Sequence, residues 1–140
     1  MELKVSIPTK AQIINGGFEI NIAADGQTWS KSQLGDYAGK SGVYILHSNG
    51  RIMYIGKTTV GDYGNFGERL RRHCQKKASG NSSIYQALLA ETSPVKAYLL
   101  DLMDLNMMID QGPIPLKDDR KALIMEQVLI GIYEPSENKI

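Results

Sequence analysis

The segment from residue 42 to residue 57, GVYILHSNGRIMYIGK, limits the possible folds more than any other part of the chain. Two short runs rich in β-branched and aromatic residues flank a Ser-Asn-Gly sequence, which is typical of a β-hairpin. Each predicted strand carries a tyrosine close to a glycine, Tyr44 after Gly42 and Tyr54 before Gly56. Because side chains alternate along a strand, the length of the loop decides whether the two tyrosines share a face.

Two loop lengths agree with the turn residues. A two-residue loop of type I′, Asn49-Gly50, would place Tyr44 opposite Ile55 and direct Tyr54 to the other face. A three-residue loop, residues 48–50, would use Gly50 in the left-handed region and place Tyr44 directly opposite Tyr54. The turn chemistry leaves both registers open, and a cross-strand aromatic pair can also be purely structural.

The other elements follow from periodicity and from capping residues. Strands 3–7 and 18–22 are expected to form a small N-terminal β-ribbon around residues 15–17, and a short helical turn is expected at 30–34. Further along the chain we predict helix 67–78, helix 83–91 capped by Asn81 or Ser82, strand 95–102, a loop at 106–115 and helix 117–132. Strands interleaved with helices over a small sheet predict an α+β or α/β-like domain, with residues 1–40 as an N-terminal extension packed on a domain of residues 41–140.

Composition narrows the class of protein. A chain of 140 residues is long enough for one domain with a real core, and 42% of its residues are hydrophobic. The longest apolar stretch, 122–133, contains Glu126 and is too short to span a bilayer, so no membrane association is expected. A lone cysteine, Cys74, cannot form an internal disulfide and suits the cytoplasm. The net charge of +1 says little about nucleic acid, so the distribution of charge must decide.

The charge is concentrated in residues 68–77, which hold five of the sixteen Lys and Arg residues. In the predicted helix, Arg69 and His73 lie one turn apart and Arg72 and Lys76 flank them, forming a cationic stripe. Phe66, Leu70 and Cys74 form an adjacent apolar stripe that is expected to pack on the sheet. Arginine matches phosphate oxygens and histidine exchanges protons near neutral pH, so the stripe suits a phosphodiester, although a merely solvated helix face is the alternative.

The last predicted helix carries a carboxylate where an apolar residue is expected. Glu126 has Ala122 and Leu123 one turn before it and Leu129 and Ile130 one turn after it. A buried carboxylate needs a cation, either a metal ion or an arginine, because leaving it unpaired costs several kcal/mol. The alternative is a glutamate that is partly exposed at the helix edge. Hydrated Mg²⁺ often takes only one protein carboxylate, which makes Glu126 a candidate metal ligand.

Together these residues resemble the GIY-YIG nuclease family over about residues 42–138. The resemblance rests on Gly42-Val43-Tyr44, Tyr54-Ile55-Gly56, Arg69 with His73, Glu126 and Asn138, in this order. The spacing of Arg69 and His73 is similar to the restriction-type branch. The resemblance implies a three-stranded antiparallel sheet flanked by helices, one divalent metal ion, Mg²⁺ or Mn²⁺, and hydrolysis of phosphodiester bonds in DNA. It also implies that both tyrosines line the active site, which favours the three-residue loop.

The resemblance assigns roles that the reaction requires. Either Tyr44 or His73 would act as general base on the attacking water, and nearby cations would have to lower the pKa of Tyr44 for it to do so. Arg69 would hold the phosphate, Tyr54 would hydrogen-bond in the same site, and Glu126 would bind the metal. Supporting positions are Gly56, Lys57 as a source of positive charge, and Asn138; the nucleic-acid-binding residues would be Arg69, Arg72 and Lys76. RNA as substrate, a homo-oligomer, a non-catalytic nucleic-acid-binding module and a purely structural protein stay open as alternatives.

Overall fold

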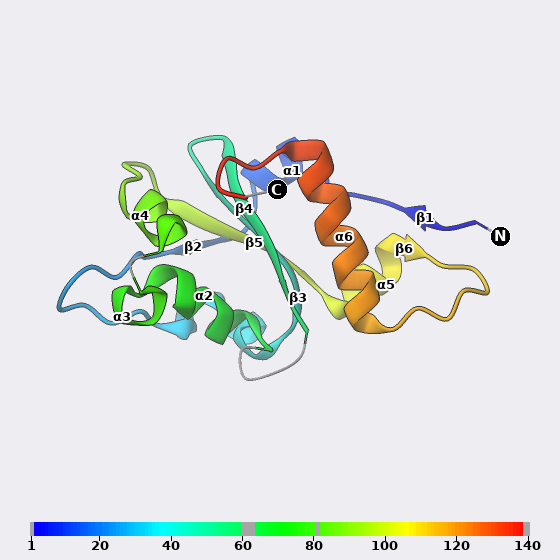
Figure 1. Cartoon of the computed structure of the whole chain (residues 1–140), viewed down its shortest axis with the longest axis horizontal. Helices are drawn as coiled ribbons and strands as arrows, with labels where there is room; N and C mark the ends of the chain where they lie inside the picture. The colour runs from blue at the N-terminus through cyan, green and yellow to red at the C-terminus, as the bar shows by residue number, and fades with distance from the viewer. Residues whose placement is uncertain (1, 60–63, 81, 139–140) are drawn as a thin grey trace.

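The computed structural model describes residues 2–59, 64–80 and 82–138 and shows one central antiparallel sheet between two layers of helices (Figure 1). The sheet has the strand order β2-β5-β3-β4. Helices α2, α3 and α4 lie on one side of it and α6 on the other. The elements in chain order are β1 (Lys4–Val5), α1 (Lys10–Ile14), β2 (Phe18–Ile20), the 3₁₀ helix η1 (Lys31–Gly39), β3 (Gly42–Ser48), β4 (Arg51–Thr58), α2 (Phe66–Cys74), α3 (Lys76–Ser79), α4 (Ser83–Leu89), β5 (Val95–Asp101), α5 (Leu102–Met108), β6 (Ile109–Asp110) and α6 (Asp118–Tyr133). The α+β class is confirmed.

The N-terminal part of the chain differs from the prediction. The expected β-ribbon is wrong, because β1 pairs with β6 and β2 pairs with β5 as a fourth strand of the central sheet. The three-stranded sheet is therefore also wrong. Between β1 and β2 the chain forms α1, whose start is fixed by a capping box in which Thr9 and Gln12 bond each other's backbone N–H groups.

The hairpin loop has two residues, so the three-residue loop is wrong. Ser48 pairs with Arg51, and Asn49 and Gly50 have φ values of 53° and 74°, which a type I′ turn requires. The tyrosines nevertheless share a face, because a β-bulge follows the turn. His47 pairs with Ile52 but Leu46 pairs with Tyr54, so β4 has one extra residue, Met53, and its alternation reverses. Tyr44 then lies opposite Gly56, on the same face as Tyr54.

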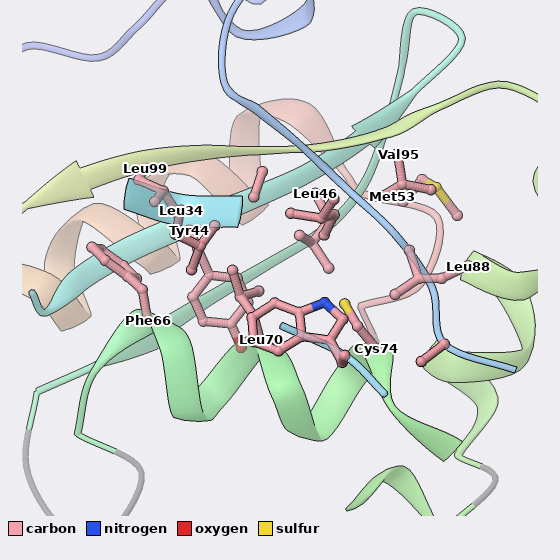
Figure 2. Close-up of a cluster of buried hydrophobic side chains, with 14 residues drawn as sticks. Leu34, Tyr44, Leu46, Met53, Phe66, Leu70, Cys74, Leu88, Val95 and Leu99 are labelled. Atoms are coloured by element: carbon pink, nitrogen blue, oxygen red, sulfur yellow. The ribbon is translucent and has the colours of Figure 1, made fainter. Parts of the chain in front are cut away.

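Each face of the sheet has its own hydrophobic core. On one face Phe66, Leu70 and Cys74 of α2 are fully buried, as predicted, and contact the cluster that includes Tyr44 and Leu46 (Figure 2). On the other face the alternate residues of β3, Val43 and Ile45, pack with the buried stripe of α6, formed by Ala122, Met125 and Leu129. This alternation fixes which strand residues face α2 and which face α6.

The helices agree with the prediction in part. Helix α4 with Ser82 as its cap, strand β5 and helix α6 lie where the sequence placed them, whereas Asn81 lies outside the described residues. A continuous helix 67–78 is wrong, because Gln75 is extended and forms a bridge with Ala23, which separates α2 from α3. A loop over the whole of 106–115 is wrong as well, since α5 runs to Met108 after a capping box of Asp101 and Asp104. Within the described residues, no helix has the length and apolar character needed to cross a membrane.

Candidate active site

Three aromatic rings meet between the hairpin and helix α2. The Tyr44 Oη atom lies 2.8 Å from the Nε2 atom of His73. The ring centroids of Tyr44 and Tyr54 are 6.1 Å apart, and those of Tyr54 and His73 are 5.1 Å apart. The bulge at Met53 and the position of His73 on α2 bring together three predicted site residues that come from three different elements. Tyr44 itself has no exposed surface.

His73 is neutral near pH 7 in this position. Burial, together with the positive charges of Arg69 and Arg72, lowers the pKa of His73 to about 4. A neutral imidazole has one nitrogen without a proton, so Nε2 can accept a hydrogen bond from the Tyr44 hydroxyl. His73 is thus a proton acceptor and not a cation, so it adds no positive charge to the predicted cationic stripe.

The pKa of Tyr44 moves in the opposite direction from the prediction. Burial is the main reason that the pKa of Tyr44 is raised, and the neighbouring Tyr54 and the charge of Glu126 act in the same sense. Arg69 favours the ionised form but does not outweigh burial. Tyr44 is therefore a phenol that keeps its proton at neutral pH, and of the two candidate bases only His73 can accept a proton there.

Arg69 is the cation of the site. It lies one helical turn before His73, and its charge acts on both Tyr44 and Tyr54. Its Nε atom is buried and has no hydrogen-bond partner within the described residues. The Arg69 side chain also hydrogen-bonds Tyr44, so the guanidinium is held against the ring cluster and carries the positive charge there.

Glu126 is half-buried, at the edge of the buried stripe of α6. The prediction that it lies within the apolar face is wrong, because Met125 occupies that position. Its carboxylate nevertheless acts on the site: burial chiefly raises the pKa of Tyr54, and the charge of Glu126 raises it further. The Oε1 atom of Glu126 accepts a hydrogen bond of 3.2 Å from Gln127.

The described part of the chain contains no group of three or more His, Cys, Asp or Glu side chains that could enclose a metal. Glu126 as a ligand of Mg²⁺ or Mn²⁺ therefore stays a prediction. Mg²⁺ usually keeps several waters and needs only one or two protein carboxylates.

The other predicted cations, Lys57, Arg72 and Lys76, do not form one stripe with Arg69. Lys57 pairs with Val43 and so begins on the face that α6 covers, opposite to Tyr44. Lys76 belongs to α3, beyond the break at Gln75, and its Nζ atom lies 2.7 Å from a carboxylate oxygen of Asp25. The exposed Arg72 stays on α2. The prediction of one continuous cationic stripe ending in Lys76 is therefore wrong.

Gly56 and Asn138 support the hairpin. A Cβ atom at Gly56 would overlap the hydroxyl oxygen and Cζ of Tyr44, so only glycine leaves room for that ring. The side-chain amide of Asn138 accepts a hydrogen bond of 2.8 Å from the Ile55 N–H and donates one of 2.9 Å to the Ile55 carbonyl. Asn138 thus pairs with the outer edge of β4 between Tyr54 and Gly56, which agrees with the supporting position predicted for it.

Sequence reasoning missed two features of this site. The direct bond between Tyr44 and His73 was not foreseen as such, although both residues were candidates. The extra residue Met53 was not foreseen at all, since no residue type in the sequence marks a bulge there. The conflict between a type I′ turn and two tyrosines on one face was the available signal, because only a bulge reconciles them.

No family model, no curated protein and no solved structure matches this chain. The resemblance to the GIY-YIG nucleases therefore rests on the motif residues of the sequence alone.

The pKa of His73 predicts a pH-dependent stability. The unfolded chain binds a proton at His73 below about pH 6.5, whereas the folded protein does so only near pH 4. The contribution of His73 to the free energy of unfolding is therefore fully present above about pH 6.5. It is lost as the pH falls from about 6.5 to 4, and the loss reaches about 3 kcal/mol. Urea unfolding across this range should show a smaller pH slope for His73→Gln than for the wild-type protein. Parallel slopes would contradict the buried, neutral histidine; His47, whose pKa burial also lowers, is the same in both proteins.

Proposed function

We propose that this chain is a metal-dependent endonuclease that hydrolyses phosphodiester bonds in DNA by a GIY-YIG type of mechanism. The observation that carries the proposal is the 2.8 Å contact between the Tyr44 hydroxyl and the neutral Nε2 atom of His73, next to the unpaired Nε of Arg69. A proton acceptor and a phosphate-binding cation in one place are two of the things that hydrolysis of a phosphodiester needs.

The residues divide the reaction as follows. Tyr44 has no exposed surface in the free chain, so substrate binding has to open the site toward its hydroxyl. The oxygen of Tyr44 then takes a proton from the attacking water while its own proton passes to Nε2 of His73, so no free tyrosinate is required. Arg69 binds a non-bridging oxygen of the phosphate and offsets the negative charge that develops on it. Tyr54, at the open side of the ring cluster, donates a hydrogen bond to the same phosphate. Glu126 would hold Mg²⁺ or Mn²⁺, which supplies charge stabilisation for the departing oxygen when it is bound.

A non-catalytic nucleic-acid-binding module would explain less of this arrangement. Such a module needs only exposed cations, which Arg72 and Lys77 already supply. It would have no use for a buried proton acceptor in contact with a phenol. The nuclease hypothesis gives both His73 and Tyr44 a role, and for that reason we favour it.

Nicking of supercoiled plasmid DNA tests the proposal. With Mg²⁺ the wild-type protein should convert the plasmid to open circles, and EDTA should stop the reaction. Glu126→Gln keeps the size of the side chain and should lower the rate by about tenfold or more, since a metal at this position is worth several kcal/mol. Asp119→Asn removes an exposed carboxylate from the same helix and should leave the rate unchanged.

Equal nicking by the wild-type and Glu126→Gln proteins would refute the metal-dependent mechanism. A single-stranded RNA of the same sequence, assayed in parallel, separates the two substrate classes. Cleavage of the RNA without nicking of the plasmid would replace DNA by RNA in the proposal.

A further inference from the structure

The sheet has an open edge where β2 ends. β2 pairs with β5 only along Val95–Ala97, and Gly17, with a φ of 99°, turns the chain away from the sheet. Residues 98–101 of β5 therefore have β3 on one side and, in the part of the chain that the structure describes, no strand on the other. A cavity of about 560 Å³ lies there and is lined by the consecutive residues Tyr98, Leu99 and Leu100. Since consecutive side chains point to opposite faces, a cavity that meets all three faces the edge of the strand.

The backbone of Leu99 points into this cavity. A Cβ atom at Gly17 would lie 2.6 Å from the carbonyl oxygen of Ala97, so that carbonyl points toward β2. A Cβ atom at Gly42 would overlap the carbonyl oxygen of Leu100, so that carbonyl points toward β3. By alternation, the N–H and C=O of Leu99 point away from β3, to the open side.

These two backbone groups lack a partner. Asp101, the next residue whose backbone points to the open side, donates its N–H to the Asp104 carboxylate at 3.0 Å. For Leu99, nothing within residues 2–59, 64–80 and 82–138 accepts from its N–H or donates to its carbonyl on the open side. An unpaired donor and acceptor at a strand edge are a template for another strand.

Both walls of the cavity are apolar and suit apolar side chains on either face of an added strand. On one side the rings of Phe18 and Tyr37 lie 5.4 Å apart, and on the other side are Ile7, Met107 and Met108. Met107 is 85% exposed, so its side chain is accessible to a bound segment. An extended chain on the β5 edge would direct its side chains alternately toward these two walls.

One end of the cavity is negative. Asp104 lines it, and Asp101 is next to Asp104 in the capping box of α5. Lys40 Nζ lies 3.5 Å from the Asp101 carboxylate, and its single positive charge acts on both carboxylates. One net negative charge therefore remains at this end of the cavity, and a positively charged group of a bound molecule could pair with it.

We propose that this open edge of β5 is a docking groove for an extended peptide segment of a partner protein, which adds to the sheet as a strand. The segment has apolar side chains at consecutive positions, which reach the two apolar walls in turn, and a lysine or arginine that pairs with Asp104. Backbone hydrogen bonds to Leu99 give the affinity, and the two apolar walls with the carboxylate give the selectivity.

A labelled peptide tests this directly. The probe is a fluorescein-tagged peptide of about eight residues, within the usual length of a strand, with consecutive Val residues in its centre and an Arg at each end. It should bind saturably in fluorescence anisotropy and should slow hydrogen exchange of the Leu99 amide. The same peptide with N-methyl groups on alternate residues should bind about tenfold more weakly, because it loses its ladder hydrogen bonds. A version with Glu in place of Arg should also bind more weakly.

Two exposed methionines of α5 provide matched variants. Met107→Lys places a cation at the groove and should weaken binding about tenfold, a loss of the size of one close charge contact. Met103→Lys changes a residue that is also exposed but lines a different cavity, and it should bind like the wild-type protein. Neither variant touches the ring cluster of the proposed active site.

Several results would overturn the proposal. These are no saturable binding, equal binding of the N-methylated peptide, or an unchanged Leu99 amide in the complex. Protection of that amide by self-association in the absence of peptide would assign the groove to a second copy of this chain instead. Because the assay does not measure cleavage, its outcome is independent of whether the chain is a nuclease.

Discussion

Replacing His73 with alanine is expected to lower the rate of DNA cleavage by about 10²–10⁴-fold, the usual contribution of a positioned general acid or base. The reason is that Nε2 of His73, 2.8 Å from the Tyr44 hydroxyl, is the one group in the ring cluster that can take a proton at neutral pH. The measurement is the single-turnover rate of plasmid nicking at saturating protein, which separates chemistry from binding.

A second substitution separates proton transfer from positioning. Glutamine at this position, His73→Gln, keeps a hydrogen-bond acceptor for Tyr44 but cannot take its proton, so it should be as slow as alanine. Tyr44→Phe should be equally slow, and the double variant should be no slower than either single variant, because the two groups act as one relay. Lys77→Gln, at an exposed position three residues beyond the end of α2, should leave the rate unchanged.

Full activity of His73→Gln would reduce His73 to a residue that only positions Tyr44. Full activity of Tyr44→Phe together with an inactive His73→Ala would mean that His73 acts on the water directly. Both results leave the nuclease in place and change the path of the proton.

Local patterns predicted the parts of the site that depend on one element. The 3.6-residue period placed Phe66, Leu70 and Cys74 on the buried face of α2, and it also placed Arg69 and His73 one turn apart. Glu126 was singled out because its neighbours are apolar, which predicted that it lies within the apolar face of the last helix. Met125 takes that buried position and leaves Glu126 at the edge. Its role as a metal ligand stays a prediction, while its charge does help to raise the pKa of Tyr54.

The parts that were wrong depend on contacts between distant residues. The break of the helix at Gln75 is set by Ala23, whose N–H bonds the Cys74 carbonyl at 2.8 Å, and nothing near residue 75 announces it. The pairing of β2 with β5 joins segments nearly eighty residues apart, so a ribbon between neighbouring segments was the simpler expectation. The pKa of Tyr44 could not be foreseen, because it is dominated by burial that only the complete core produces.

Replacing Gly56 with alanine is expected to cost both stability and activity. The new Cβ atom would overlap the hydroxyl oxygen of Tyr44, and the Tyr44 ring is fully buried against α2 and cannot simply move aside. Overpacking of this kind costs about 1–3 kcal/mol of the free energy of unfolding. Because the overlapped atom is the one that contacts His73, the nicking rate should also fall by at least about tenfold, as expected for a misplaced catalytic group.

Urea unfolding and plasmid nicking of the same preparations measure the two effects. Gly131→Ala is the matched control: it makes the same change in α6, where no atom lies within 4 Å of the new Cβ, so it should keep full activity and gain up to about 1 kcal/mol from helix propensity. Adding Tyr44→Phe to Gly56→Ala removes the overlapping oxygen and should recover part of the lost stability without recovering cleavage. If Gly56→Ala unfolds and nicks like the wild-type protein, Gly56 does not hold Tyr44 against His73. If the double variant recovers no stability, the cost lies in the backbone of β4 and not in the Tyr44 hydroxyl.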